Sequence, residues 1–433
     1  MNGLPEAFLG RMRKQLGDEL PDFLHAMAGE PFRGIRFNPL KPEGCAVYPH
    51  PPERIPWEQN GWYLTENEMP GITIWHEAGA FYLQDPAAMI PVNVLHPQPG
   101  ERILDLCAAP GGKSTQIGAA MRGEGLLICN EPVPKRAQVL SRNLERMGIR
   151  NAAAVCAMPD MLAERWPEGF DAVLADVPCS GEGMFRRDPP SREEWSEEQA
   201  AGCAERQRGI LRAAARMVRA GGRMLYSTCT FNPAENEENI AWFLREHPDW
   251  ETEAFRLPDI DGQTGMFTCL PHRTKGEGQF AALLRRKGEG KAVLSGDASV
   301  QKPGKAEKEM VRNILPSMPQ PTHMLGNTLT YVPDCPDMKG IRIFRLGLHL
   351  AEIRGKHPVP DHAAAYWAGE QTQRTNLSPD AALRYMAGEP VPGAENGWTV
   401  VSCQGMPLGW GKGSDGIIKN HYPRGLWNRR LTV

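Results

Sequence analysis

Two of the ten cysteines stand in short polar turns that directly follow apolar runs. Cys179 follows the run Phe170–Asp176, and Cys229 follows the run Arg223–Thr228. A thiolate at such a place is a nucleophile, and the carboxyl group of Asp176 is suited to general acid help beside it. If the two runs are neighbouring parallel strands, the thiols and the carboxylate meet at the carboxyl edge of one sheet. We therefore expect a chemical role for these two cysteines.

A second segment, Arg102–Thr115, has the pattern of a strand, a glycine-rich turn and a helix. Gly112-Lys113-Ser114 matches the end of a P-loop, which would bind nucleotide phosphates with magnesium. The first glycine of a P-loop would have to stand at position 107, where the chain has Cys107. A side chain at that place obstructs the loop that wraps the phosphates. The P-loop is therefore the less favoured alternative.

A Rossmann-like nucleoside site fits the same segment better. Asp105 ends the first strand, and Glu131 follows Gly112 by about 20 residues, where an acidic residue holds ribose hydroxyls. The turn lacks the pattern G-x-G-x-x-G and is a poor pyrophosphate binder, so S-adenosylmethionine fits better than NAD. The turn residues expected to bind this cofactor are Cys107, Ala108, Ala109, Pro110, Gly111, Gly112 and Lys113.

Apolar runs alternate with helical stretches from about residue 100 onward. Helices are expected after Gly112, over Lys135–Met147, and from an N-cap at Ser191 to Val218, with Gly221-Gly222 ending the last one. This alternation predicts an α/β fold with a mostly parallel, doubly wound sheet. The expected strands are Arg102–Leu106, Leu126–Asn130, Ala152–Cys156, Phe170–Asp176 and Arg223–Thr228.

Two thiols and a carboxylate beside a methyl donor point to one kind of reaction. Carbon 5 of a cytosine is a poor nucleophile, but a thiolate that adds to carbon 6 turns carbon 5 into an enamine-like carbon that can take a methyl group. A proton or hydrogen bond at N3 assists that addition, and a second thiol can help to expel the first. The base must leave its stack to reach such a pocket.

At these residues the chain resembles the Sun/nucleolar-protein family of RNA cytosine-5 methyltransferases. The similarity runs over about residues 30–287 and includes Leu104–Lys113, the turns of both cysteines, and His76–Pro86. The resemblance implies a class I methyltransferase fold, S-adenosylmethionine as cofactor and RNA as substrate.

The resemblance also implies roles for single residues. It makes Cys229 the nucleophile, Cys179 the thiol that aids release, and Asp176 the contact to the base near N3 and to the cofactor. Lys113 would point into the same site, Glu131 would hold the ribose, and Arg136 stands where the family has a basic residue. The residue that contacts the adenine stays open, with Asp160 as one candidate.

The C-terminal part resembles the bacterial RsmF/YebU branch of this family, which adds a PUA-like RNA-binding module. Residues 411–433 hold five Lys and Arg against one Asp, interleaved with aromatic rings, which suits RNA phosphates and unstacked bases. Arg186-Arg187 either grip an RNA phosphate or belong to a solvated loop. We divide the chain into an N-terminal α/β lobe (1–75), the methyltransferase domain (76–287), a linker (288–310), a small α/β connecting domain (311–378) and the PUA-like module (379–433).

Composition limits the partners. A net charge of −3 and 23% charged residues exclude disorder over most of the chain and a wholly basic nucleic-acid binder. The first 20 residues have no signal-peptide pattern, and cysteines and histidines lack metal-ligand spacing, so we expect a cytoplasmic, monomeric protein without membrane or metal. The resemblance to the RsmF/YebU branch, with the C-terminal module, implies 16S rRNA as the expected partner, with the small ribosomal subunit. The alternatives are tRNA as substrate, or a non-catalytic RNA-binding factor in ribosome assembly.

Overall fold

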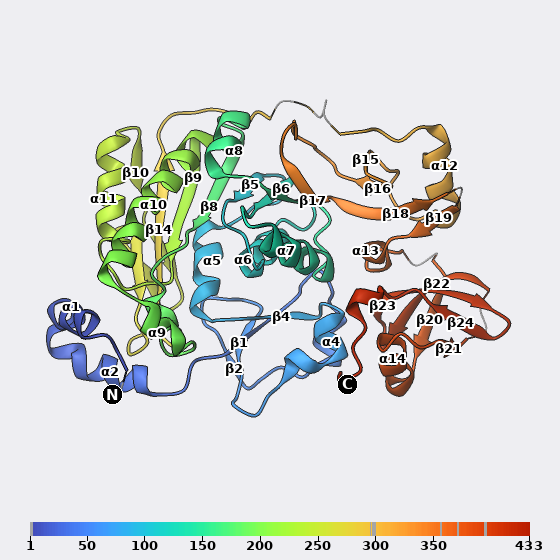
Figure 1. The fold of residues 1–433 in the computed structure, drawn as a ribbon, viewed down its shortest axis with the longest axis horizontal. Coiled ribbons are helices and arrows are strands. Elements are labelled where there is room, and N and C mark those ends of the chain that lie inside the picture. The colour runs from blue at the N-terminus through green and yellow to red at the C-terminus, as the bar shows by residue number, and fades with distance from the viewer. Residues whose placement is uncertain (1–2, 295, 297–299, 356, 370–371, 394–395) are drawn as a thin grey trace.

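The computed structural model describes the chain except for residues 1–2, 295, 297–299, 356, 370–371 and 394–395 (Figure 1). At its centre the described residues form a nine-stranded sheet in which β5, β6, β7, β8 and β9 run parallel. The expected Rossmann-like fold is confirmed, and β8 lies between β5 and β9. The strand order is β10 (Trp250–Thr252), β14 (Gln279–Arg286), β9 (Val218–Thr228), β8 (Phe170–Asp176), β5 (Arg102–Asp105), β6 (Leu126–Asn130), β7 (Ala152–Cys156) and β17 (Arg342–Leu346), while β13 (Met266–Cys269) also pairs with β14.

Helices cover both faces of this sheet (Figure 1). On one face, α5 (Ile90–Leu95), α6 (Gly112–Ala120) and α7 (Pro134–Arg146) bury side chains such as Ile117 and Leu140 against the strands. In α7 the buried apolar residues Ala137, Leu140 and Leu144 are spaced three or four apart, so they share the stripe that faces the sheet. The opposite face is covered by α8 (Pro159–Arg165), α10 (Glu197–Met217) and α11 (Glu237–Glu246).

The helix predicted over 191–218 is two helices. α9 (Pro190–Glu194) ends before Trp195, and α10 begins after Ser196, whose hydroxyl accepts a hydrogen bond from the Gln199 backbone N–H. The prediction that Ser191 is the N-cap is wrong, because its hydroxyl donates to the Asp188 carbonyl instead. The prediction that Gly221-Gly222 ends the helix is also wrong, because β9 already begins at Val218 and includes both glycines.

The N-terminal part has two pieces. The first is a hairpin of α1 (Glu6–Leu16) and α2 (Leu20–Ala28), joined by η1 (Gly17–Glu19). The second is a small antiparallel sheet in the order β2 (Glu53–Arg54), β3 (Gly61–Tyr63), β1 (Gly34–Phe37) and β4 (Phe81–Gln84). β4 lies beyond residue 75, so the sheet of the lobe takes its last strand from the segment that leads into the catalytic domain. The short elements α3 (Gly44–Val47), η2 (Pro70–Ile72), α4 (Ile74–Glu77) and η3 (Ala87–Met89) connect these strands.

The segment after β14 contains more structure than the expected linker. Lys305–Ile314 folds as α12, so the linker prediction is wrong for its last residues, and its positions 295 and 297–299 lie outside the described residues. The following four-stranded sheet has the order β15 (His323–Leu325), β16 (Thr328–Tyr331), β18 (Leu348–Arg354) and β19 (His357–Pro360). β17 leaves this unit and pairs antiparallel with β7, at the edge of the central sheet.

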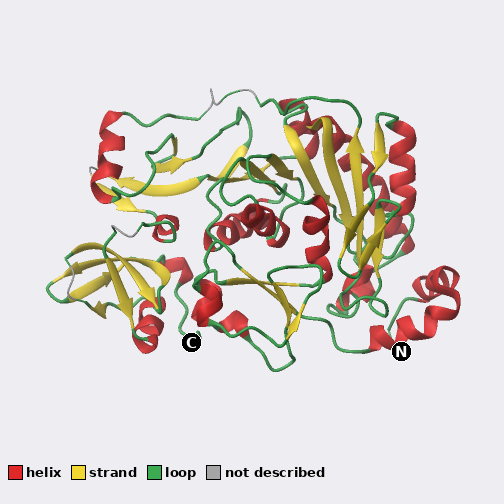
Figure 2. Ribbon diagram, turned by 180° about the vertical axis from the view of Figure 1, so that it is seen from behind, coloured by secondary structure: helices red, strands yellow, loops and turns green. Residues whose placement is uncertain are grey.

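The C-terminal module is a five-stranded sheet with α14 (Pro379–Met386) against it (Figure 2). The chain then returns to the N-terminal lobe, where the Thr432 N–H donates to the Ile72 carbonyl and the Thr432 carbonyl accepts from Ile74 N–H. Among the described residues, no helix combines the length and the apolar character that crossing a membrane requires. The order of the strands in the C-terminal sheet is β20 (Arg374–Leu377), β22 (Gly397–Cys403), β23 (Met406–Ser414), β24 (Ile417–Asn420) and β21 (Val391–Pro392). Short elements elsewhere in the chain are η4 (Glu182–Met184), β11 (Phe255–Leu257), β12 (Ile260–Gly262), α13 (His362–Ala365) and η5 (Arg424–Leu426).

Candidate active site

A cavity of about 230 Å³ lies where the carboxyl ends of β5 and β8 meet the N-terminal lobe. Its floor includes Asp105, whose burial raises the pKa of that carboxyl from 3.8 to about 7, although the Ser114 hydroxyl donates to Asp105 Oδ2. Asp105 Oδ1 has no hydrogen-bond partner among the described residues. The catalytic domain lines the cavity with Asp105, Cys107, Ala108, Ala109, Pro110, Gly112, Lys113 and Asp176, and the lobe region with Tyr82, Leu83, Gln84, Asp85 and Ala88.

The glycine-rich turn is held by the lobe. Gly111 has a φ of 114°, a conformation that side chains disfavour, and α6 begins directly after it. Arg36 in β1 is buried and donates from Nη2 to the Gly112 carbonyl at 2.9 Å and to Thr115 Oγ1 at 3.0 Å. The N-terminal sheet therefore fixes both the wall of the cavity and the first turn of α6.

Glu131 and Arg136 lie beside the cavity but are not among its lining residues. Glu131 is 2% exposed and accepts hydrogen bonds from the Val133 N–H, while Arg136 Nη1 lies 3.2 Å from Glu131 Oε2. Arg136 also donates from Nη2 to the Ala109 carbonyl. The arginine thus ties the end of β6 to the glycine-rich turn. Asp160 is exposed in the first turn of α8.

Lys113 and Asp176 form the charged centre of the cavity. Lys113 Nζ lies 2.7 Å from Asp176 Oδ2, and the Ser227 hydroxyl donates to Asp176 Oδ1 at 2.6 Å. Burial alone would lower the pKa of Lys113, but the Asp176 carboxylate outweighs it and the pKa is raised. The ammonium group therefore stays charged, and both oxygens of Asp176 are held in place.

Cys179 and Cys229 lie together at the ends of β8 and β9. Their sulfur atoms are 3.1 Å apart, and the Cys229 N–H donates to Cys179 Sγ at 3.2 Å. The hydrogen bond with Cys229 and burial raise the pKa of the Cys179 thiol well above its usual value. Cys179 is therefore held as a neutral thiol. The expectation that both cysteines end neighbouring strands is confirmed.

The expectation that Arg186 contacts RNA or solvent is wrong. Arg186 is buried and makes a two-bond ion pair with Glu277, at 2.9 and 2.7 Å, and it donates to the Ala26 carbonyl. Arg187 donates to the Phe32 carbonyl and lies near Asp85. Both side chains join the catalytic domain to the N-terminal part; Arg186 is buried there, while 28% of the Arg187 side chain stays exposed.

Sequence reasoning missed several residues around the site. Asn130, at the end of β6, donates to the carbonyls of Leu106 and Ala157 and accepts from the Ala157 N–H, so it joins three strand ends. Ser227 and the cavity wall from Tyr82 to Asp85 were also missed as parts of the site. The signal for the wall was present in the sequence, because these residues belong to the stretch His76–Pro86 that already showed the family similarity.

Comparison with known proteins shows which proteins the chain is similar to along almost its whole length. Residues 92–285 match the family described as 16S rRNA methyltransferase RsmB/F, residues 4–86 match the N-terminal domain of 16S rRNA methyltransferase RsmF, and residues 372–427 match the methyltransferase RsmF PUA domain. A ribosomal RNA small subunit methyltransferase F of Klebsiella pneumoniae is 32% identical, with 98% of this chain and 96% of that protein covered. The protein of the same name from Vibrio vulnificus is 31% identical, with 98% and 97% covered.

This chain belongs to the RsmF family of methyltransferases. Solved structures agree: a methyltransferase homolog protein from Pyrococcus horikoshii is 26% identical with a TM-score of 0.58, covering 66% of this chain and 96% of that one. NSun6 from Pyrococcus horikoshii, at 21% identity and a TM-score of 0.56, covers 66% of this chain and 99% of its own and shows the same fold.

Family membership settles three expectations. The resemblance to the RsmF branch is confirmed, and so is the PUA domain near the C-terminus, an RNA-binding module. The methyl donor is S-adenosylmethionine, and the P-loop alternative is wrong. The residues around the cavity fit this cofactor: an apolar turn with a backbone open to a ligand, an acidic residue after β6, and a buried carboxylate oxygen of Asp105 without a partner among the described residues.

Proposed function

We propose that this RsmF family member methylates carbon 5 of a cytosine in the 16S rRNA of the small ribosomal subunit. The observation that carries the proposal is the placement of two sulfur atoms 3.1 Å apart, next to the ion pair of Lys113 and Asp176. The named relatives are small-subunit rRNA methyltransferases, which supports rRNA as the substrate.

In this proposal the Cys229 thiolate attacks carbon 6 of the cytosine, and the electrons of the C5–C6 double bond make carbon 5 nucleophilic. S-adenosylmethionine, bound at the turn Cys107–Lys113, supplies the methyl group to carbon 5. As carbon 6 is attacked, N3 takes a proton from water, and Asp176, held by Lys113 and Ser227, accepts a hydrogen bond from that N3–H and so stabilises the added form. A water molecule then takes the proton from carbon 5, which restores the double bond, expels Cys229 as a thiolate and lets N3 release its proton.

Cys179 has a different role in the proposal. Its pKa is raised by its hydrogen bond with Cys229 and by burial, so its thiol carries a proton beside the leaving sulfur. A neutral thiol at 3.1 Å stabilises the departing thiolate through that hydrogen bond. Glu131 is proposed to hold the ribose of the cofactor, and Arg136 Nη1, 3.2 Å from Glu131 Oε2, to keep that carboxylate in place.

The decisive experiment maps 5-methylcytosine in cellular RNA with and without the gene. We expect one cytosine of 16S rRNA to lose its methyl group when the gene is absent, and to regain it when the wild-type gene, but not Cys229→Ala, is supplied. If a cytosine of tRNA loses its methyl group instead, the substrate is tRNA and the proposed chemistry is unchanged. No change in any RNA would overturn the proposal in favour of a non-catalytic role in ribosome assembly.

A further inference from the structure

A buried carboxylate joins the turns of the two cysteines. Glu182 follows Cys179 by three residues and is fully buried in η4. Its Oε2 accepts a hydrogen bond from the backbone N–H of Phe231, two residues after Cys229, and its Oε1 accepts from Trp195 Nε1. The Gly183 N–H also donates to the Cys229 carbonyl. The relative position of the two turns therefore depends on this carboxylate.

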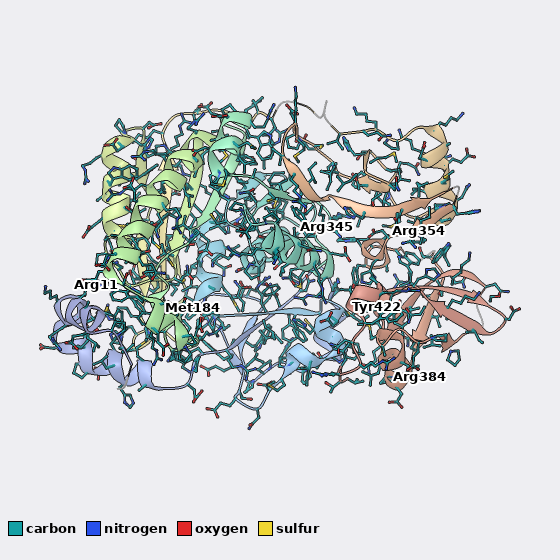
Figure 3. The ribbon with its side chains drawn as sticks, in the orientation of Figure 1. Arg11, Met184, Arg345, Arg354, Arg384 and Tyr422 are labelled. Carbon is teal, nitrogen blue, oxygen red and sulfur yellow. The ribbon has the colours of Figure 1, made fainter. Side chains whose placement is uncertain are left out.

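The cation that balances Glu182 comes from the N-terminal helix α1. Arg11 Nη2 lies 2.6 Å from Glu182 Oε2, and the guanidinium lies over the rings of Phe8 and Trp195. Figure 3 labels Arg11, which lies on α1, and Met184, which lies in η4 together with the partner of Arg11, Glu182. Burial raises the pKa of Glu182, and Arg11 opposes that shift. Without Arg11 the carboxylate would be left unpaired in an apolar surrounding.

The rest of the hairpin is built to support this contact. Aromatic rings from α1 and α2 pack against rings from both cysteine loops, and Gln15 of α1 donates to the Phe231 carbonyl at 3.1 Å. The hairpin thus contacts the Cys229 turn directly as well as through Glu182. The rings of this cluster are Phe8, Phe23, Phe185, Trp195 and Phe231.

We propose that Arg11 is a positioning residue for the two-cysteine site, and that it acts through Glu182 to fix the Cys229 turn against the Cys179 turn. The inference rests on the proposed function, because it assigns consequences to the reaction of Cys229. A buried ion pair that loses one member leaves an uncompensated charge, which must take up a proton or move toward water. Either change weakens the hydrogen bond from the Phe231 N–H to Glu182 and moves the Cys229 sulfur away from the position at which it attacks carbon 6.

The test uses the full-length protein and compares Arg11→Met with Arg13→Met as the matched control. Arg13 lies on the same helix, is exposed, and forms no ion pair or side-chain hydrogen bond described in the structure. Four quantities are measured: kcat and KM with RNA, the Kd for S-adenosylmethionine, and the rate at which the Cys229–RNA adduct forms in a Cys179→Ala background. Arg11→Lys is included as the conservative variant.

We expect Arg11→Met to lower kcat and the adduct rate together by about tenfold to a hundredfold, as a small misplacement of a reacting atom does. KM and the cofactor Kd should stay within about twofold, Arg11→Lys should recover most of the loss, and Arg13→Met should match the wild type. A wild-type kcat in folded Arg11→Met, or a rise in KM alone, would overturn the inference.

Two further outcomes are separated by design. If Arg11→Met does not fold, the pair Arg11→Met/Glu182→Gln is measured, because it leaves no buried charge unpaired. A reduced kcat with normal cofactor Kd in this pair supports the inference, and a wild-type kcat overturns it. If the wild-type protein itself forms neither product nor adduct, the proposed function fails, whatever the Arg11 variants do.

Discussion

The sulfur atoms of Cys179 and Cys229 lie 3.1 Å apart, although 50 positions separate the two residues in the chain. The register of the parallel pair β8 and β9 explains this, because Asp176 stands opposite Ser227. Each strand then runs into a turn, and the two turns place one cysteine each at the same height. The pair is therefore a product of sheet topology, and the following predictions test what it does.

The first prediction separates the two cysteines. Cys229→Ala should lower methyl transfer by about a thousandfold or more, because it removes the attacking atom, while the cofactor still binds. Cys179→Ala should instead accumulate a protein–RNA adduct that survives denaturing gels. The double variant should form no adduct. An adduct that persists without Cys229 would assign the attack to another residue.

The second prediction concerns the support of Asp176. Ser227→Ala removes the hydrogen bond to Asp176 Oδ1 and should lower kcat about tenfold, since a bond to a charged group contributes about 1.5–3 kcal/mol. The Kd for S-adenosylmethionine, measured by calorimetry, should change little. Ser191→Ala is a suitable control because that hydroxyl donates to the Asp188 carbonyl and Ser191 is not among the residues that line the cavity. Equal kcat values in the two variants would contradict the role of Ser227.

The third prediction is a pH dependence of stability without cofactor. Burial raises the pKa of Asp105 from 3.8 to about 7, so the folded protein holds a proton that the unfolded chain loses. The contribution of this group is therefore present at low pH and is lost as pH rises from about 4 to about 7. The free energy of unfolding of the wild type should therefore fall between about pH 5 and about pH 7.5. In Asp105→Asn this fall should be smaller by about 2 kcal/mol, because the variant has no carboxyl group to titrate at this position. Urea unfolding of both proteins at both pH values measures this change. An equal change in the wild type and in Asp105→Asn would refute the raised pKa of Asp105.

The fourth prediction follows from the burial of Arg186. Arg186→Met leaves Glu277 without its cation and should lower the free energy of unfolding by about 3–5 kcal/mol. The slope of log Kd for RNA against log salt should not change, because the arginine contacts no phosphate in this arrangement. A weaker salt dependence at unchanged stability would restore the RNA-contact interpretation.

The fifth prediction takes up the basic C-terminal module. Lys412 and Lys419 are exposed on the neighbouring strands β23 and β24. Lys412→Ala/Lys419→Ala should reduce the slope of log Kd against log salt by about 0.7 for each lost contact to single-stranded RNA. The free energy of unfolding should fall by about 1 kcal/mol at most, because the Lys412 ammonium lies over the Trp398 ring. An unaltered slope would show that RNA does not reach this face.

Much of the fold could be predicted because its signals are local. The strand ends at Asp105, Asp176 and Thr228 lie where apolar runs stop, and parallel topology brings such ends to one edge. The start of α10 was missed because two serines, Ser191 and Ser196, are each followed within three residues by a pair of glutamates. The burial of Trp195 among aromatic rings decides between them, and that packing comes from distant segments.

The site was predictable only in part, for the same reason. Two consecutive arginines after a turn are typical of a solvated loop, and the partner that buries Arg186 is Glu277, 91 positions away. The cavity wall around Tyr82 and Gln84 likewise comes from a strand whose pairing partner, β1, lies far upstream. Residues that act through contacts between separate parts of the chain leave no local pattern.

The pairing of β17 with β7 has a consequence for any attempt to divide this protein. Residues Arg342–Leu346 cover what would otherwise be an open edge of the central sheet. A catalytic fragment ending at Arg286 would present that edge to other copies of itself and tend to aggregate. A full-length chain cleaved between Arg286 and Lys305 should, by contrast, remain one particle, because the strand on the far side of the cut stays bonded to the sheet.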